Sequence, residues 1–173
     1  MNQEALENMR TRRSIRAYQP QQIKAEELDA VLEAGTWAPT GMGRQSPRIV
    51  VVQDKATRDE LSRLNARALG SQEGDPFYGA PTVLVVFADT ARPTYREDGT
   101  LVMANLMLAA HAVGLGSCWI HRAKPVFASP EGRALMQKWG LGENYEGIGH
   151  CILGYAAQQP KPAPRKTDYI IRT

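Results

Sequence analysis

Hydrophobic positions are densest between residues 101 and 113, where Asn105 and His111 are the only polar side chains. A helix built from this segment has no polar stripe, and a helix that is apolar all round is a buried helix. The chain then passes two glycines and resumes as the apolar run Ser117–Ile120, which is too short for a helix and suits an interior strand. We therefore predict a core helix that leads into a strand. Asn105 is expected to form an interhelical hydrogen bond, with a ligand contact as the less favoured alternative.

Elsewhere, amphipathic helical segments alternate with short β-branched runs. Pro39 should end the second helix, because the residue before a proline is pushed out of helical geometry. Asp54 and Ser129 are predicted N-caps, and Gly149 and Gly154 indicate either a bulge or a close backbone approach within a strand. The alternation by itself favours a parallel sheet. Further helices are predicted over residues 4–12, 24–38, 55–69 and 129–140, and strands over 49–52, 82–88, 148–155 and 168–172.

Composition narrows the class of protein. The 173 residues are 43% hydrophobic and 23% charged, which fits one globular domain over residues 1–173. The apolar run is shorter than the roughly 20 residues that span a bilayer, and the first residues lack a secretory signal, so we expect a cytoplasmic protein without a membrane segment. Cys118 and Cys151 lie in apolar runs and are expected to be buried, reduced thiols.

The net charge of +3 is too small to argue for nucleic acid, but its distribution is uneven. In an extended backbone Arg12, Ser14 and Arg16 point to one side, where two guanidinium groups and a hydroxyl could surround a small anion. A solvated basic helix end explains the same spacing equally well. Arg165 and Lys166 form a second basic group in the proline-rich tail.

Several chemistries are disfavoured by what the sequence lacks. It has no C-x-x-C or H-x-x-H pair for zinc, and no G-x-S-x-G, Walker or G-x-G-x-x-G motif. Cys118 and His121 are three residues apart, so on a strand they face opposite sides and do not form a nucleophile pair. The glycine-containing loop 40–47 either presents Thr40 and Gln45 to a polar ligand or simply connects two elements.

Four segments, in this order along the chain, resemble the nitroreductase family of FMN-dependent oxidoreductases. They are Arg12-Arg13-Ser14-Ile15-Arg16, Ala38-Pro39-Thr40 with Gln45, the stretch A-A-H-A-V-G-L-G-S-C-W-I, and Pro164-Arg165-Lys166. The resemblance implies an α+β fold with a mostly antiparallel central sheet flanked by helices. It also implies a homodimer with FMN at the interface, in which the C-terminal extension 158–173 wraps the partner.

The resemblance assigns roles to residues of this chain. Arg12, Ser14 and Arg16 would hold the FMN phosphate, ribityl chain or ring O2 edge, joined at the phosphate by the tail. Pro39, Thr40 and Gly41 would border the flavin of the partner subunit. The backbone N–H of His121 would reach flavin N5. The complete set implied for FMN is Arg12, Arg13, Ser14, Arg16, Pro39, Thr40, Gly41, Gln45, Trp119, Ile120, His121, Arg122, Arg165 and Lys166, with no metal ligand and no protein acid or base.

The expected reaction is a ping-pong transfer of hydride from NAD(P)H through FMN to a nitroaromatic, quinone or similar small-molecule acceptor. One alternative is a specialised flavin enzyme, such as an enone reductase, a dehalogenase or a flavin-fragmenting enzyme. A second is a flavin-binding sensor without turnover, and a nucleic-acid-binding module is a distant third. Gly43 departs from the family, in which Asn is usual, so one side-chain contact to the flavin is expected to be missing.

Overall fold

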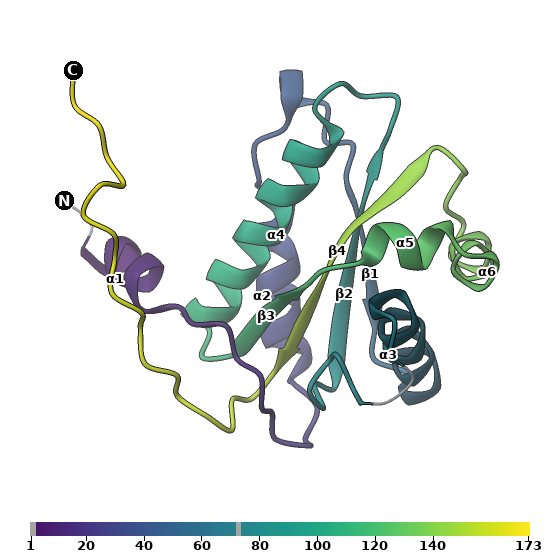
Figure 1. Ribbon diagram of the computed structural model, residues 1–173, viewed down its shortest axis with the longest axis horizontal. Coiled ribbons are helices and arrows are strands. Elements are labelled where there is room, and N and C mark those ends of the chain that lie inside the picture. The colour runs from purple at the N-terminus through teal and green to yellow at the C-terminus, as the bar shows by residue number, and fades with distance from the viewer. Residues whose placement is uncertain (1–2, 72–73) are drawn as a thin grey trace.

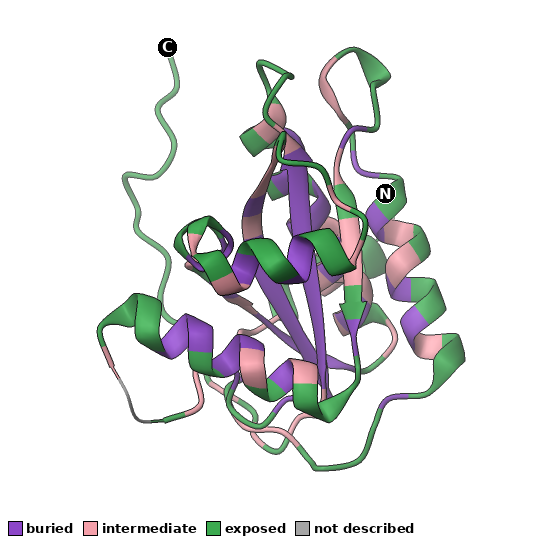
Figure 2. Ribbon diagram, turned by 90° about the vertical axis from the view of Figure 1, so that its right-hand side faces the viewer, coloured by how far each residue is buried: buried purple, intermediate pink, exposed green. Residues whose placement is uncertain are grey.

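The sheet is antiparallel throughout its four strands. In the computed structural model, which describes residues 3–71 and 74–173, the strand order is β1-β2-β4-β3 (Figure 1). Each of the three strand pairs is antiparallel, which confirms the sheet implied by the family resemblance and shows that the parallel sheet was wrong. α3 crosses the direction of the strands, so the chain re-enters the sheet in the opposite sense (Figure 2). The strands are β1 (Arg48–Val52), β2 (Thr82–Asp89), β3 (Gly116–Ile120) and β4 (Tyr145–Gly154).

Helices cover both faces of this sheet. α2 and α4 lie against one face, and α3, α5 and α6 lie against the other (Figure 1). Two buried apolar clusters result, one on each face, and β2 and β4 contribute to both. The helices are α1 (Gln3–Thr11), α2 (Ala25–Thr36), the 3-10 turn η1 (Gly41–Gly43), α3 (Lys55–Leu69), α4 (Tyr95–Ala112), α5 (Ala123–Ala128) and α6 (Pro130–Lys138).

α4 is the predicted core helix, and it begins three residues before Asp98. Its Asn105 side chain donates a hydrogen bond of 2.9 Å to the Ala34 carbonyl of α2, as predicted for an interhelical contact. The prediction that this helix is buried on all sides is wrong within one chain, because Leu101 is 41% exposed. The sheet and α2 cover only part of the helix circumference, which leaves an apolar face uncovered.

Two predicted helix N-caps and one predicted close backbone approach are present in the structure. Asp54 accepts a hydrogen bond from the Thr57 amide at 2.9 Å, and Ser129 accepts one from the Gly132 amide at 3.1 Å, so both predicted N-caps are confirmed. At Gly149 a Cβ atom would lie 2.9 Å from the Trp119 ring, which confirms the close approach. Helix α2 ends at Thr36, two residues before the predicted end at residue 38. Residues 37 and 38 instead form a short 3-10-like turn before Pro39.

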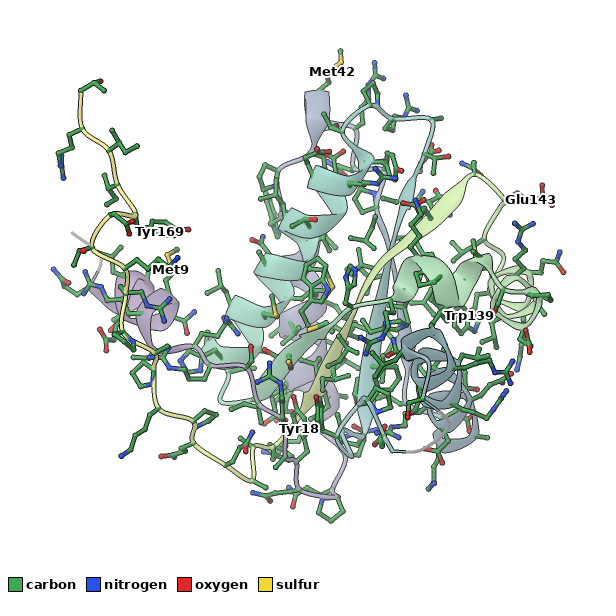
Figure 3. All side chains as sticks on the ribbon, in the orientation of Figure 1. Met9, Tyr18, Met42, Trp139, Glu143 and Tyr169 are labelled. Atoms are coloured by element: carbon green, nitrogen blue, oxygen red, sulfur yellow. The ribbon has the colours of Figure 1, made fainter. Side chains whose placement is uncertain are left out.

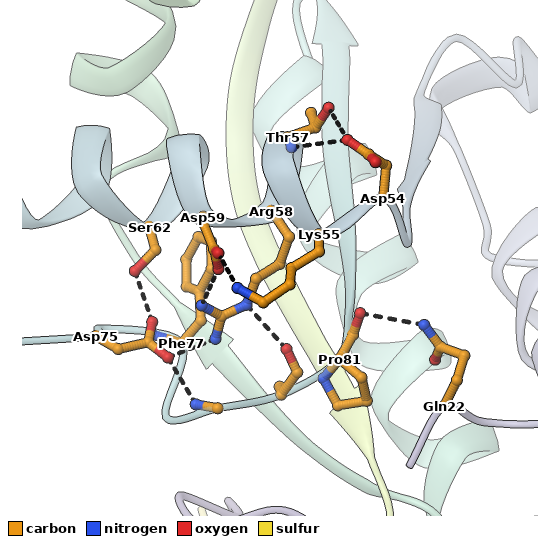
Figure 4. Close-up of polar contacts among 12 residues, drawn as sticks. Gln22, Asp54, Lys55, Thr57, Arg58, Asp59, Ser62, Asp75, Phe77 and Pro81 are labelled. Atoms are coloured by element: carbon orange, nitrogen blue, oxygen red, sulfur yellow. Dashed lines mark hydrogen bonds and ion pairs between the residues drawn. The ribbon is translucent and has the colours of Figure 1, made fainter. Parts of the chain in front are cut away.

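A partly buried ion pair fixes the segment before β2 against α3. Asp75 accepts hydrogen bonds from Arg58 and Ser62 and from the backbone amides of Phe77 and Gly79 (Figure 4). Burial raises the pKa of the Asp75 carboxyl, but these bonds outweigh it and hold the pKa below its usual value. The anchored segment places the Phe77 ring in the core.

The C-terminal segment leaves the body of the molecule (Figure 1). Tyr169, Ile170 and Ile171 are 86%, 70% and 87% exposed, and residues 168–172 do not form the predicted strand. A strand needs a neighbour for its backbone hydrogen bonds, and the described part of this chain offers the tail none. Across residues 3–71 and 74–173, no helix is both long and apolar enough to cross a membrane.

Candidate functional site

The arginine motif lies along the outer edge of β3. Ser14 forms a parallel bridge with Ser117, and the Ile15 amide donates a 3.0 Å hydrogen bond to the Ser117 carbonyl. β3 is the last strand of the sheet, so its outer edge has no further strand beside it. The bridge therefore brings the arginine motif and the predicted flavin segment of β3 to one edge of the sheet.

A cleft of about 430 Å³ opens beside this bridge. Arg12 lines it, and the Arg12 Nη1 atom is buried without a hydrogen-bond partner among the described residues. Arg13, by contrast, donates to the carbonyls of Arg10 and Arg12 at 2.7 Å each. A buried guanidinium donor without a partner is costly unless an acceptor fills the place. This feature favours the anion site over the solvated helix end, and it fits a phosphate group.

His111 lies in the same cleft, at the C-terminal end of α4. Its Nε2 atom is 2.8 Å from the Thr11 hydroxyl. Burial lowers the pKa of the His111 imidazole, and the charges of Arg12 and Arg13 lower it further. The arginines therefore supply the positive potential of the cleft, and His111 adds no fixed positive charge.

The end of β3 carries the predicted flavin-lining segment, residues 119–122. The Ser117 carbonyl faces outward to Ile15, so alternation directs the Ile120 carbonyl inward, toward β4. The peptide group between Ile120 and His121 is trans and planar, so its N–H points opposite to its carbonyl. The His121 N–H therefore points outward from the sheet edge. The geometry is that of a free backbone donor on the same edge as Arg12.

The predicted loop residues lie at the other end of α4. The Gly41 amide donates to Asp98 at 2.9 Å, and the Gln45 amide donates to the Thr40 hydroxyl at 3.0 Å. Asp98 and His111 are thirteen residues apart on one helix, which is about 20 Å. In Figure 3, Met42 of this loop and Met9 of α1 mark the two separated ends. One chain does not bring Pro39, Thr40, Gly41 and Gln45 to the arginine cleft.

The remaining predicted residues are exposed. Arg16 is exposed on the segment that follows the bridge, and Lys166 is exposed in the tail. Arg165 donates to the Ala163 carbonyl at 3.2 Å, within the tail itself. Pro162 lines the arginine cleft and precedes Arg165 by three residues, so the tail passes the cleft but does not place these cations in it.

Asn65 of α3, which is fully buried, was not among the residues predicted for the site. Its side chain hydrogen-bonds to the backbone of His121 and to the side chain of Arg122. A signal was present: Asn65 follows Leu61 by four residues and so interrupts the apolar stripe of α3 with an amide. A polar residue at an inward position needs a buried partner.

A model of the nitroreductase family matches residues 9–155 of the chain. The chain belongs to the nitroreductase family. A Bacteroides fragilis nitroreductase solved with bound FMN superimposes with a TM-score of 0.91, at 30% identity and covering 98% of each chain. This membership confirms the family and the fold class predicted from the four motifs.

Two curated proteins align with most of this chain. A protein of Archaeoglobus fulgidus, provisionally named NADH dehydrogenase/NAD(P)H nitroreductase, is 30% identical over 88% of this chain and 86% of its own. The iodotyrosine deiodinase of Thermotoga neapolitana is 28% identical over 61% of this chain and 67% of its own.

Proposed function

We propose that this nitroreductase-family chain is an FMN-dependent oxidoreductase that moves hydride from NAD(P)H to a nitroaromatic, quinone or similar acceptor in two half-reactions. The unpartnered Arg12 donor in the cleft beside β3 is the observation that carries this proposal. FMN-bound structures of relatives and the names of curated relatives support the cofactor and the co-substrate. When bound, FMN supplies N5, the atom that accepts and donates hydride.

The residues of the chain bind and orient this cofactor. Arg12 is proposed to donate to the phosphate, since a guanidinium group stays charged and bonds phosphate bidentately. Ser14 and Arg16 extend the same edge, and Arg165 and Lys166 are proposed to reach the phosphate when the tail is ordered.

At the reacting end, the outward N–H of His121 is proposed to donate to N5 and so fix the distance to the nicotinamide. Trp119, Ile120 and Arg122 continue the wall beside it. Because the cofactor carries the redox chemistry, no side chain needs to act as acid or base.

A homodimer completes the proposed site. Pro39, Thr40, Gly41 and Gln45 lie about 20 Å along α4 from the arginine cleft, so they serve a partner's flavin rather than that of their own chain. The uncovered face of α4 at Leu101 is proposed to lie in the dimer core.

Changing Arg12 to Leu tests the phosphate assignment. Loss of a charge-assisted hydrogen bond of about 1.5–3 kcal/mol should weaken FMN binding ten- to a hundredfold, measured by quenching of FMN fluorescence. Arg10→Ala is the control, because Arg10 is exposed on α1, directly before the segment that holds Arg12. Wild-type protein that purifies colourless and takes up no FMN would refute the proposed function, and unchanged FMN affinity in Arg12→Leu would refute the assignment alone.

Dehalogenation remains a second candidate, because the iodotyrosine deiodinase relative shares 28% identity with this chain. The chemistry differs in the acceptor and not in the cofactor. NAD(P)H oxidation measured with a nitroaromatic, a quinone, an enone and a halogenated phenol separates these activities. Bound FMN without steady-state turnover on any of these acceptors would instead indicate a flavin-binding sensor.

A further inference from the structure

Asn65 is a fully buried amide that contacts two consecutive residues at the end of β3. Its Nδ2 atom donates to the His121 carbonyl at 2.8 Å. Its Oδ1 atom accepts from Nε and Nη2 of Arg122 at 3.1 and 2.9 Å. One side chain on α3 thus holds both the backbone and the side chain of the turn between β3 and α5.

The turn held in this way is backbone that an ordinary residue rarely adopts. Arg122 has φ +76° and ψ 14°, in the left-handed region, where a residue with a Cβ atom is strained. Such a conformation persists only where neighbouring contacts determine it. The hydrogen bonds of Asn65 to His121 and Arg122 are contacts of this kind, and they hold the turn that follows the end of β3 at Ile120.

A second buried side chain acts on the preceding peptide. The Nδ1 atom of His150 lies 3.3 Å from the Ile120 carbonyl oxygen and 3.5 Å from Asn65 Nδ2. The shorter contact is to an oxygen that can only accept, which favours a proton on Nδ1. The His150 ring is held between Phe77 and Phe127, with ring centroids 5.3 and 5.9 Å away. The Asp75 cluster of Figure 4 anchors Phe77 in turn.

These contacts draw two successive carbonyls into the interior. Since each trans peptide directs its N–H opposite to its carbonyl, the amides of His121 and Arg122 both point away from the interior. Neither amide has a recorded acceptor within residues 3–71 and 74–173. Two adjacent free N–H groups form a fixed donor pair at the sheet edge.

We propose that Asn65 is a positioning residue of the flavin site, which fixes the His121–Arg122 donor pair at the edge of β3. His150 supports it by holding the Ile120 carbonyl. Asn65 touches neither cofactor nor substrate, and it acts through the orientation of the two backbone amides. The inference rests on the proposed function, because the donor pair matters only if a flavin edge lies against it.

The change Asn65→Leu removes the hydrogen bonds to His121 and Arg122, and the 3.5 Å contact of Nδ2 with His150 Nδ1, while keeping a side chain of similar volume. The matched control is Thr57→Ala, which removes a side-chain hydrogen bond to the N-cap Asp54 at the other end of α3 and touches none of the residues around His121. Hydrogen–deuterium exchange of the peptide spanning residues 117–123, in the purified protein, reports the turn directly. We expect at least tenfold faster exchange in Asn65→Leu and less than twofold change in Thr57→Ala.

A second readout is the two-electron midpoint potential of the bound FMN. Donors aimed at the developing charge favour the reduced cofactor, so loss of their alignment should reduce the preference for reduced FMN about tenfold. That change equals a midpoint potential about 30 mV lower. If Asn65→Leu does not fold, Asn65→Asp replaces it, since it keeps the acceptor for Arg122 but opposes two oxygens at His121.

The outcomes separate the two proposals. FMN uptake by the wild type, with exchange and potential in the Asn65 variant matching those of Thr57→Ala, overturns the positioning role and leaves the proposed function standing. No FMN uptake by the wild type overturns both. Faster exchange together with a lowered potential supports both.

Discussion

His150 shows how a single buried residue links folding to pH. Burial lowers the pKa of its imidazole to about 4, although hydrogen bonds to the Ile120 and His121 carbonyls oppose the shift. The unfolded chain, with a pKa near 6.5, binds the proton first as pH falls, so the free energy of unfolding decreases between pH 6.5 and pH 4.

The loss from His150 alone is about 2 kcal/mol between pH 7.5 and pH 5. Urea denaturation at the two pH values measures it. In His150→Gln, which does not titrate, the difference between the two free energies should shrink by about that amount. An equal difference in the variant and the wild type would contradict the prediction.

Arg12, Asn65 and Asn105 show which site residues and contacts can be predicted from a sequence and which cannot. Arg12 was predicted to bind the cofactor because it lies in the arginine motif, whereas Asn65 belongs to no motif. Its role depends on the packing of α3 under the end of β3, where Asn65 contacts His121, 56 positions further along the chain. No local pattern encodes this contact. Asn105 lay between these cases: an amide in an apolar helix requires a partner, and Ala34 supplies it.

For most segments the sequence predicted whether a helix or a strand forms, but it did not predict how the strands pair. Helix α3 was predicted at its observed bounds, since Asp54 caps it and Gly70 ends it in the left-handed conformation. The direction of the strands could not be predicted from alternation, because a helix that crosses a sheet and one that runs along it have the same apolar stripe. Only the family resemblance indicated the antiparallel sheet.

The tail is the element whose structure one chain cannot determine. Tyr169, Ile170 and Ile171 are exposed side chains that make an apolar end after a proline-rich segment. Exposed apolar clusters mark interaction sites, and the open edge of β1 on a second copy offers unpaired backbone groups. This fits the expectation that the extension wraps the partner.

Changing these three tail residues to Ser should weaken the dimer at least a hundredfold, since each buried apolar side chain contributes about 2 kcal/mol. Sedimentation velocity across a dilution series measures the dissociation constant. Leu69→Ser is the control, because Leu69 is 58% exposed at the end of α3. A dissociation constant equal to that of the control would show that the tail has another function.

At the scale of the whole molecule, the two ends of α4 predict a shared site. If Arg12 of one chain and the Gly41 loop of the other bind the same FMN, two defective chains should complement each other. Gly41→Val disturbs the loop, because its first side-chain carbon would lie 2.2 Å from the Thr94 hydroxyl.

In a heterodimer of one Arg12→Leu chain and one Gly41→Val chain, one site carries both defects and the other carries neither. Purification with two different tags should therefore recover about half the wild-type FMN content, while each homodimer binds little. FMN content in the heterodimer no greater than in the homodimers would show that each site lies within one chain.

Cys118 and Cys151 lie on neighbouring strands but belong to the apolar clusters on opposite faces of the sheet. Both are free, no more than 1% exposed, and burial raises the pKa of the Cys151 thiol to about 12. Thiol-directed reagents need an accessible thiolate, so in the folded protein both cysteines resist labelling. A fluorophore or spin label can thus be attached at one introduced surface cysteine, for example in the tail, without first replacing the native ones.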